Sequence, residues 1–262
     1  MFIYQRYSDN AARRVLPIVN TGVEDTQYPA SNLIDDQPSI PAKLLTTVGS
    51  WVWQFLIPQT VEFVSFFHHN LHPSVDVRIQ GNNMNVWTAP SLDVPFVIPP
   101  PHSNGFRPAP WLDLSNMGPS YLFWRLVIAS DNPDLIAISE VWLGENLRVL
   151  EPGIRWEHKE EDWIPTITHR TIYGVRMSYG LNVEVRKLQG ETPATEASLA
   201  DIREWWWDAR GMERPIVIVK DDSINEALLV TFAKDTLSAD REFTDFTPLS
   251  LEFEEISRGL YL

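Results

Sequence analysis

The feature that most constrains the fold is a loop followed by a strand, which together run from Ala30 to Trp53 (ASNLIDDQPSIPAKLLTTVGSWVW). The loop is rich in Asn, Asp and Pro, residues that favour turns. In the strand, Trp51 and Trp53 lie two positions apart, so their side chains share one face. The chain contains no cysteine, and its stability must come from burial of apolar surface. We infer a β-sandwich that presents loops for binding.

The first half continues as a series of short strands. Strand-like patterns occupy residues 61–71, 75–81, 121–130 and 136–145. The proline-rich stretch 89–114 predicts a long ordered loop or an edge crossing instead of a strand. In this order and spacing the segments resemble the discoidin-like, galactose-binding type of jelly-roll sandwich. We expect this first domain to cover residues 1–148.

The second half follows a different pattern, which begins where Pro152 and Gly153 interrupt the strands. Residues 149–262 predict a second domain of strands, one helix and further strands. The helix is expected over 198–210. Ser198 and Asp201 would form a capping box at its start, and Gly211 would be the left-handed residue at its end.

This element order, together with the stretch DIREWWWDARGMERPIVIVKD, is similar to the small split-barrel module of bacteriophage tail-tube, distal-tail and baseplate-hub proteins. The fold class expected for the whole chain is therefore mainly β. It combines an N-terminal discoidin-like jelly-roll sandwich with a C-terminal small antiparallel split barrel that carries one helix.

The resemblance to the sandwich also implies a candidate calcium site. In carbohydrate-binding relatives the loop oxygens and a Glu near the last strand hold the ion, which implies Asn32, Asp35 and Glu140 as ligands here. Calcium requires six to eight oxygens. The sequence departs from the relatives' pattern at Asp36, Ile40 and Ala42. The alternative is that Asn32 and Asp35 form Asx turns and that Glu140 is a solvated strand residue. Apart from this calcium, we expect no cofactor.

Tryptophan rings are candidates for stacking on sugars. Trp51 and Trp53 share a strand face, which favours core packing. Trp87 and Trp111 lie near turn-rich segments, so we predict that they are exposed and bind glycan.

Three histidines, His68, His69 and His72, lie close together. Adjacent residues of a strand point to opposite faces, and no carboxylate-bearing metal motif follows. The spacing therefore predicts exposed or hydrogen-bonded histidines at a strand end, not a metal site.

Three consecutive tryptophans, Trp205, Trp206 and Trp207, lie on the predicted helix. An amphipathic helix can bury two adjacent large side chains, but the third must lie at its flank. We predict that Trp206 or Trp207 contacts a neighbouring subunit or domain. The alternative is a ring that lies flat on its own domain.

Charge and motifs exclude several classes of function. The formal net charge of −14 argues against nucleic-acid binding, which requires a basic surface. No apolar run approaches the length of a membrane span. The amino terminus lacks the apolar region of a secretory signal, so we expect synthesis and folding in the cytoplasm. The chain shows no nucleophile elbow or phosphate-binding loop, and we expect no enzymatic activity.

These features predict a structural virion protein of a bacteriophage tail tip, either a distal-tail or a baseplate component. It would assemble as a homo-oligomeric ring and contact the tail tube, hub and tape-measure proteins. After synthesis in the host cytoplasm it would reside in the virion. The alternative function is a carbohydrate-binding module protein that attaches to host-surface glycans.

Overall fold

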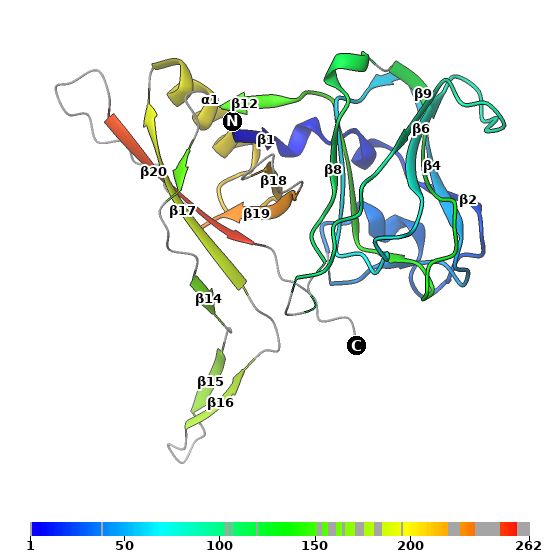
Figure 1. Cartoon of the computed structure of the whole chain (residues 1–262). Coiled ribbons are helices and arrows are strands. Elements are labelled where there is room, and N and C mark those ends of the chain that lie inside the picture. The colour runs from blue at the N-terminus through cyan, green and yellow to red at the C-terminus, as the bar shows by residue number, and fades with distance from the viewer. Residues whose placement is uncertain are drawn as a thin grey trace. The chain divides into compact units, whose positions relative to one another are not determined.

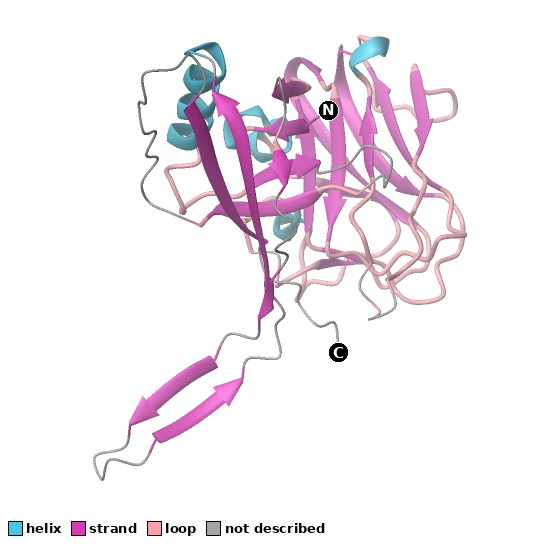
Figure 2. Ribbon diagram, turned by 60° about the vertical axis from the view of Figure 1, so that its left-hand side comes forward, coloured by secondary structure: helices cyan, strands magenta, loops and turns pink. Residues whose placement is uncertain are grey.

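In the computed structural model, most of the regular secondary structure is antiparallel β-strand (Figure 1), and Figure 2 distinguishes the strands from the few helical segments. This confirms the expected mainly-β class. The structure describes residues 2–37, 39–102, 105, 107–118, 120–150, 154–156, 161–163, 166–170, 176–180, 185–194, 196–219, 226–233 and 247–255. Within these ranges, no helix is long and apolar enough to cross a bilayer.

The chain forms two compact units. The first contains Met1–Glu151 and Ile216–Leu229, and the second contains Pro152–Pro215 and Val230–Leu262. The predicted domains, 1–148 and 149–262, differ from these units chiefly in Ile216–Leu229, which lies with the first unit. The division into domains stays a prediction.

The first unit is a sandwich of two main sheets. The five-stranded sheet has the order β2-β4-β9-β6-β7, with strands Ile18–Thr21, Gly49–Thr60, Ser120–Ile128, Val77–Asn82 and Leu92–Pro95. The three-stranded sheet has the order β11-β5-β8, with strands Glu140–Gly144, Phe63–Phe67 and Trp111–Asp113. Two short strands, β3 (Ala42–Lys43) and β10 (Ala137–Ile138), pair with each other.

The core of the sandwich lies between these sheets. It contains Trp51, Trp53 and Trp124 from the five-stranded sheet, and Phe66 and Val141 from the three-stranded sheet. The prediction that Trp51 and Trp53 are core residues is confirmed, since both are fully buried.

The proline-rich stretch 89–114 contains two short strands, β7 and β8, so the prediction that it forms no strand was wrong. Both strands lie at sheet edges, where a strand pairs on one side only. Proline is tolerated there because an edge strand does not need every backbone N–H for pairing.

The N-terminal strand β1 (Phe2–Gln5) lies outside the two main sheets. It pairs on one side with β12 (Arg148–Leu150) and on the other with β18 (Ile216–Val219). Short 3-10 helices at Tyr7–Asp9, Ala11–Arg14, Ala30–Leu33 and Ser115–Met117 complete the described helical structure of this unit.

In the second unit, β17 (Val185–Ala194) is the central strand. It pairs with β20 (Thr247–Glu255), β13 (Arg155–Trp156) and β14 (Glu161–Trp163). β19 (Leu228–Phe232) pairs with β20 through its last three residues. β15 (Thr166–Arg170) and β16 (Arg176–Gly180) form a separate two-stranded ribbon.

The predicted helix exists, as α1 (Glu196–Asp208). Ser198 lies inside this helix, whereas an N-cap residue precedes the first helical turn. The prediction that Ser198 opens the helix was therefore wrong. At its end Arg210 and Gly211 are both left-handed, with φ of 50° and 64°. Arg210 N–H donates to the Trp207 carbonyl and Gly211 N–H donates to that of Trp206, both at 3.0 Å, which is a Schellman ending.

Candidate functional site

The outer face of the five-stranded sheet carries a row of polar side chains. Arg125 of β9 lies opposite Gln80 of β6, which lies opposite Asp93 of β7. Their sequence neighbours Trp124 and Ile79 point into the core. Since successive side chains of a strand alternate between faces, the polar row must lie on the outside of the sandwich.

Hydrogen bonds link this row into one network. Arg125 donates from Nε and Nη2 to Gln80 Oε1, at 2.9 and 2.5 Å. Gln80 Nε2 donates to Asp93 Oδ1 at 3.0 Å, and Arg78 Nε donates to the same oxygen at 2.7 Å. Partial burial raises the pKa of Asp93, but the bonds from Arg78 and Gln80 outweigh it and hold the pKa below its ordinary value.

Trp87 lies over this network. It belongs to the loop between β6 and β7, and its ring centroid is 4.6 Å from Arg125 Cζ, a cation–π contact. The indole Nε1 donates to Asn85 Oδ1 at 2.7 Å. Asn82 fixes the loop, because its amide donates to the Val86 carbonyl at 2.7 Å. Trp87 is half-buried, so its predicted glycan-binding role stays a candidate.

Trp111, the second predicted glycan residue, is only 8% exposed. Its strand pairs with β5, and its ring stacks on Phe63 at a centroid distance of 5.9 Å. The prediction that Trp111 is exposed was wrong, because strand pairing turns the ring inward.

The predicted calcium ligands have other partners. Glu140 is fully buried, and its Oε1 is 2.8 Å from Arg13 Nη2, which also pairs with Asp36. Tyr7 completes the cluster: its hydroxyl donates to Asp36 Oδ2 at 3.0 Å and accepts from Arg13 Nη1 at 3.1 Å. Burial raises the pKa of Glu140 well above its ordinary value, although the charge of Arg13 opposes this. Glu140 is therefore not a solvated strand residue.

The two predicted calcium ligands in the loop, Asn32 and Asp35, form hydrogen bonds with nearby backbone groups. Asn32 donates its amide to the Pro41 carbonyl at 3.2 Å, and Asp35 Oδ1 accepts from Gln37 N–H at 2.9 Å, an Asx turn. Within the described ranges, no group of three or more His, Asp or Glu side chains could hold a metal ion. A guanidinium, not a cage of oxygens, faces Glu140, so these residues do not fit calcium.

His69 and His72 are hydrogen-bonded, as predicted. The buried His69 ring contacts the Pro108 carbonyl through Nε2 at 3.1 Å and accepts from Leu71 N–H at Nδ1, at 3.2 Å. Burial lowers the pKa of His69 to about 4. His72 Nδ1 accepts from Ser74 N–H at 3.2 Å. Both nitrogens of His69 are engaged within the fold.

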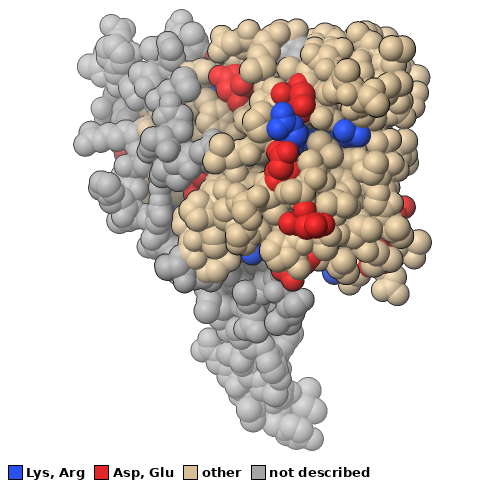
Figure 3. Space-filling view, turned by 45° about the vertical axis from the view of Figure 1, so that its right-hand side comes forward, with Lys and Arg blue, Asp and Glu red and all other residues tan. Residues whose placement is uncertain are grey.

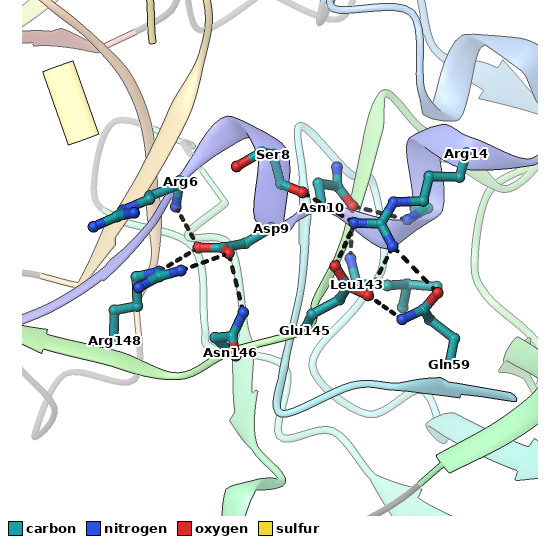
Figure 4. A network of polar contacts seen from close by, with 11 residues as sticks. Arg6, Ser8, Asp9, Asn10, Arg14, Gln59, Leu143, Glu145, Asn146 and Arg148 are labelled. Atoms are coloured by element: carbon teal, nitrogen blue, oxygen red, sulfur yellow. Dashed lines mark hydrogen bonds and ion pairs between the residues drawn. The ribbon is translucent and has the colours of Figure 1, made fainter. Parts of the chain in front are cut away.

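A second polar network, shown in Figure 4, holds the N-terminal segment to the end of β11 and to the residues that follow it. Asp9 accepts from Arg148 Nε at 2.6 Å and from Asn146 Nδ2 at 3.1 Å. Arg14 binds Glu145 through both terminal nitrogens. These bonds join residues far apart in the sequence, so no local pattern indicated them, and their role is structural.

The three helix tryptophans differ in exposure. Trp205 is fully buried against Phe232 and Phe253, at centroid distances of 5.0 and 5.5 Å. Trp206 is half-buried, and Trp207, which packs edge-on to Trp206 at 5.2 Å, is 71% exposed. The expectation that one ring would lie at the flank is confirmed. A subunit contact through Trp206 or Trp207 stays a prediction.

On the face shown in Figure 3, most of the visible acidic and basic side chains lie in one narrow band. The rest of the described surface on that face carries little charge. The formal charge of −14 is therefore not displayed there as one acidic patch.

No family model and no curated protein matches the chain. Among solved structures, it is similar to the lectin domain of lectinolysin complexed with Lewis b antigen (11% identity, TM-score 0.41, 53% of this chain and 98% of that one). It is also similar to CpGH89CBM32-6 from Clostridium perfringens (13%, 0.37, 52% and 99%). A third similar structure is XRCC1 bound to the DNA polymerase β catalytic domain (13%, 0.37, 50% and 98%).

Proposed function

We propose that the first unit binds glycans on the outer face of its five-stranded sheet, around Trp87. The observation that carries this proposal is the position of the indole. Arg125 supports the ring from the sheet, and Asn85 holds its N–H at 2.7 Å. A ring held in one orientation offers a stacking surface for a sugar without further loss of side-chain entropy on binding.

The surroundings of Trp87 suit a ligand with many hydroxyl groups. Side-chain amides of Gln80, Asn82, Asn83 and Asn85 lie in the same network or in the loop that carries the ring. Amides both donate and accept hydrogen bonds, as sugar hydroxyls require. Ionised Asp93 adds a carboxylate acceptor to this network.

A glycan array, followed by NMR titration of the strongest sugar, would test this proposal. Trp87→Ala should weaken binding by about fivefold or more, since a single stacked aromatic contributes about 1 kcal/mol or more to a weak complex. Trp207→Ala, which removes an exposed indole from the second unit, is the matched control and should bind as the wild type does. Equal binding by wild type and Trp87→Ala would refute the proposal.

A second candidate is the tail-tip assembly subunit expected from the sequence resemblance. The observation that favours it is Trp207, a large apolar ring that is 71% exposed at the end of α1. In a ring, a neighbouring subunit would cover this indole. Light scattering over a concentration series should then show a closed oligomer that Trp207→Ala dissociates. A wild-type monomer at all concentrations would contradict self-assembly.

A further inference from the structure

Arg125 is a half-buried cation that forms no ion pair within the part of the chain that the structure describes. Its Nε and Nη2 both donate to a single oxygen of Gln80. Asp93, the carboxylate of the network, is bonded to Arg78 and Gln80 instead. Arg125 thus contributes a positive charge that no described carboxylate neutralises directly.

The geometry of the guanidinium leaves one edge for a ligand. A guanidinium has five N–H groups in one plane, and the contact with Gln80 uses the edge formed by Nε and Nη2. The edge formed by Nη1 and Nη2 presents two parallel donors, the arrangement that matches both oxygens of a carboxylate. Among the described residues, none accepts a hydrogen bond from Nη1, and Cζ lies over the ring of Trp87.

Partial burial strengthens this site. The ring of Trp87 excludes water from one side of the guanidinium, which lowers the local dielectric and strengthens attraction to an anion. Burial lowers the pKa of Arg125, and Asp93 opposes this, but an arginine retains its proton at physiological pH. Because the whole chain has a formal charge of −14, an anionic ligand must depend on this local contact instead of long-range attraction.

We propose that the site prefers glycans that carry a carboxylate, of the uronic-acid type. The sugar ring would stack on Trp87, and its carboxylate would accept two hydrogen bonds from Nη1 and Nη2 of Arg125. This inference rests on the proposed glycan-binding function and adds the class of sugar to it.

NMR titration of the Trp87 indole N–H would compare methyl galacturonoside, its uncharged methyl ester and methyl galactoside. The acid should bind about tenfold more tightly than the two neutral sugars, the effect of a charge-assisted bidentate contact. Arg125→Gln should remove this preference, and Arg125→Lys should retain part of it. Arg14→Gln removes the same charge at an arginine that pairs with Glu145 outside the site, and it should leave the preference unchanged.

Equal affinity for the acid and its ester would overturn the inference, and this comparison needs only the wild-type protein. The inference would also be overturned if Arg125→Gln lowered the affinity for all three sugars by the same factor. In either case the proposed function would stand, provided that Trp87→Ala still weakens the binding of every sugar. If Trp87→Ala leaves the affinity for every sugar unchanged, the glycan site itself is misplaced.

Discussion

Acidification should destabilise the first unit through His69. Leu71 N–H donates to Nδ1 of this ring, so Nδ1 carries no proton, and the proton on Nε2 is donated to the Pro108 carbonyl. A second proton, on Nδ1, would face the Leu71 N–H, and the imidazole would lose one hydrogen bond. Because His69 is buried, water cannot solvate the charge of the protonated ring. These contacts give a physical reason for a pKa near 4.

The size of the effect follows from linkage. Below the ordinary pKa of 6.5 the unfolded chain binds a proton, which the folded chain refuses until the pH approaches about 4. The contribution of His69 to the free energy of unfolding is therefore fully present above pH 6.5, and it is lost as the pH falls from 6.5 to about 4. The gap between 6.5 and about 4, at about 1.4 kcal/mol for each pH unit, corresponds to about 3 kcal/mol.

This contribution can be measured by urea unfolding of the wild type and His69→Gln between about pH 7 and about pH 4, with tryptophan fluorescence as the signal. Gln keeps a donor for Pro108 but does not titrate. The other ionisable groups are common to both proteins, so they cancel in the difference. The stability advantage of the wild type should shrink by about 3 kcal/mol as the pH falls. A constant difference, or an NMR titration of the folded His69 ring near 6.5, would refute the reasoning.

Three further substitutions test the packing. Gly81→Ala would place a Cβ against an aromatic ring of β9 and should cost about 1–3 kcal/mol in urea unfolding; an unchanged midpoint would show that the ring can move. Trp205→Ala removes a fully buried indole from the second unit and should cost about 3–5 kcal/mol, whereas a loss below about 1 kcal/mol would mean that α1 is not docked. Arg13→Met leaves Glu140 buried without its cation and should cost about 3–5 kcal/mol, with Glu140→Gln in the same chain restoring most of it. If the double variant is no more stable than Arg13→Met alone, the unpaired charge of Glu140 is not the cause of the lost stability. Calcium and EDTA should leave the wild-type Tm unchanged by calorimetry, and a calcium-dependent Tm would contradict the role assigned to Arg13.

The candidate site was only partly predictable. Trp87 could be singled out because an indole in a turn-rich loop is hard to bury locally. Its partner Arg125 could not, since the two meet only when the loop folds back over β9. Trp111 looked equally exposed in the sequence, but pairing of its strand with β5 placed the ring against Phe63.

The sequence by itself determined features that depend on local periodicity. Leu249, Leu251 and Phe253 alternate with polar residues, and all three are buried along β20. Ile202 and Trp205 lie three positions apart on α1 and share its buried face. A strand or helix repeats its faces at a fixed interval, so neighbouring residues suffice to assign them.

Only the tertiary structure decided which remote side chains meet. Arg13 and Glu140 are separated by 127 positions, and nothing near either residue indicates that a guanidinium would take the place expected for calcium. β1 likewise pairs with β18 of the C-terminal half, an arrangement that no boundary signal in the sequence marks. Such contacts depend on strand order and on which segments exclude water together, and those are properties of the whole chain.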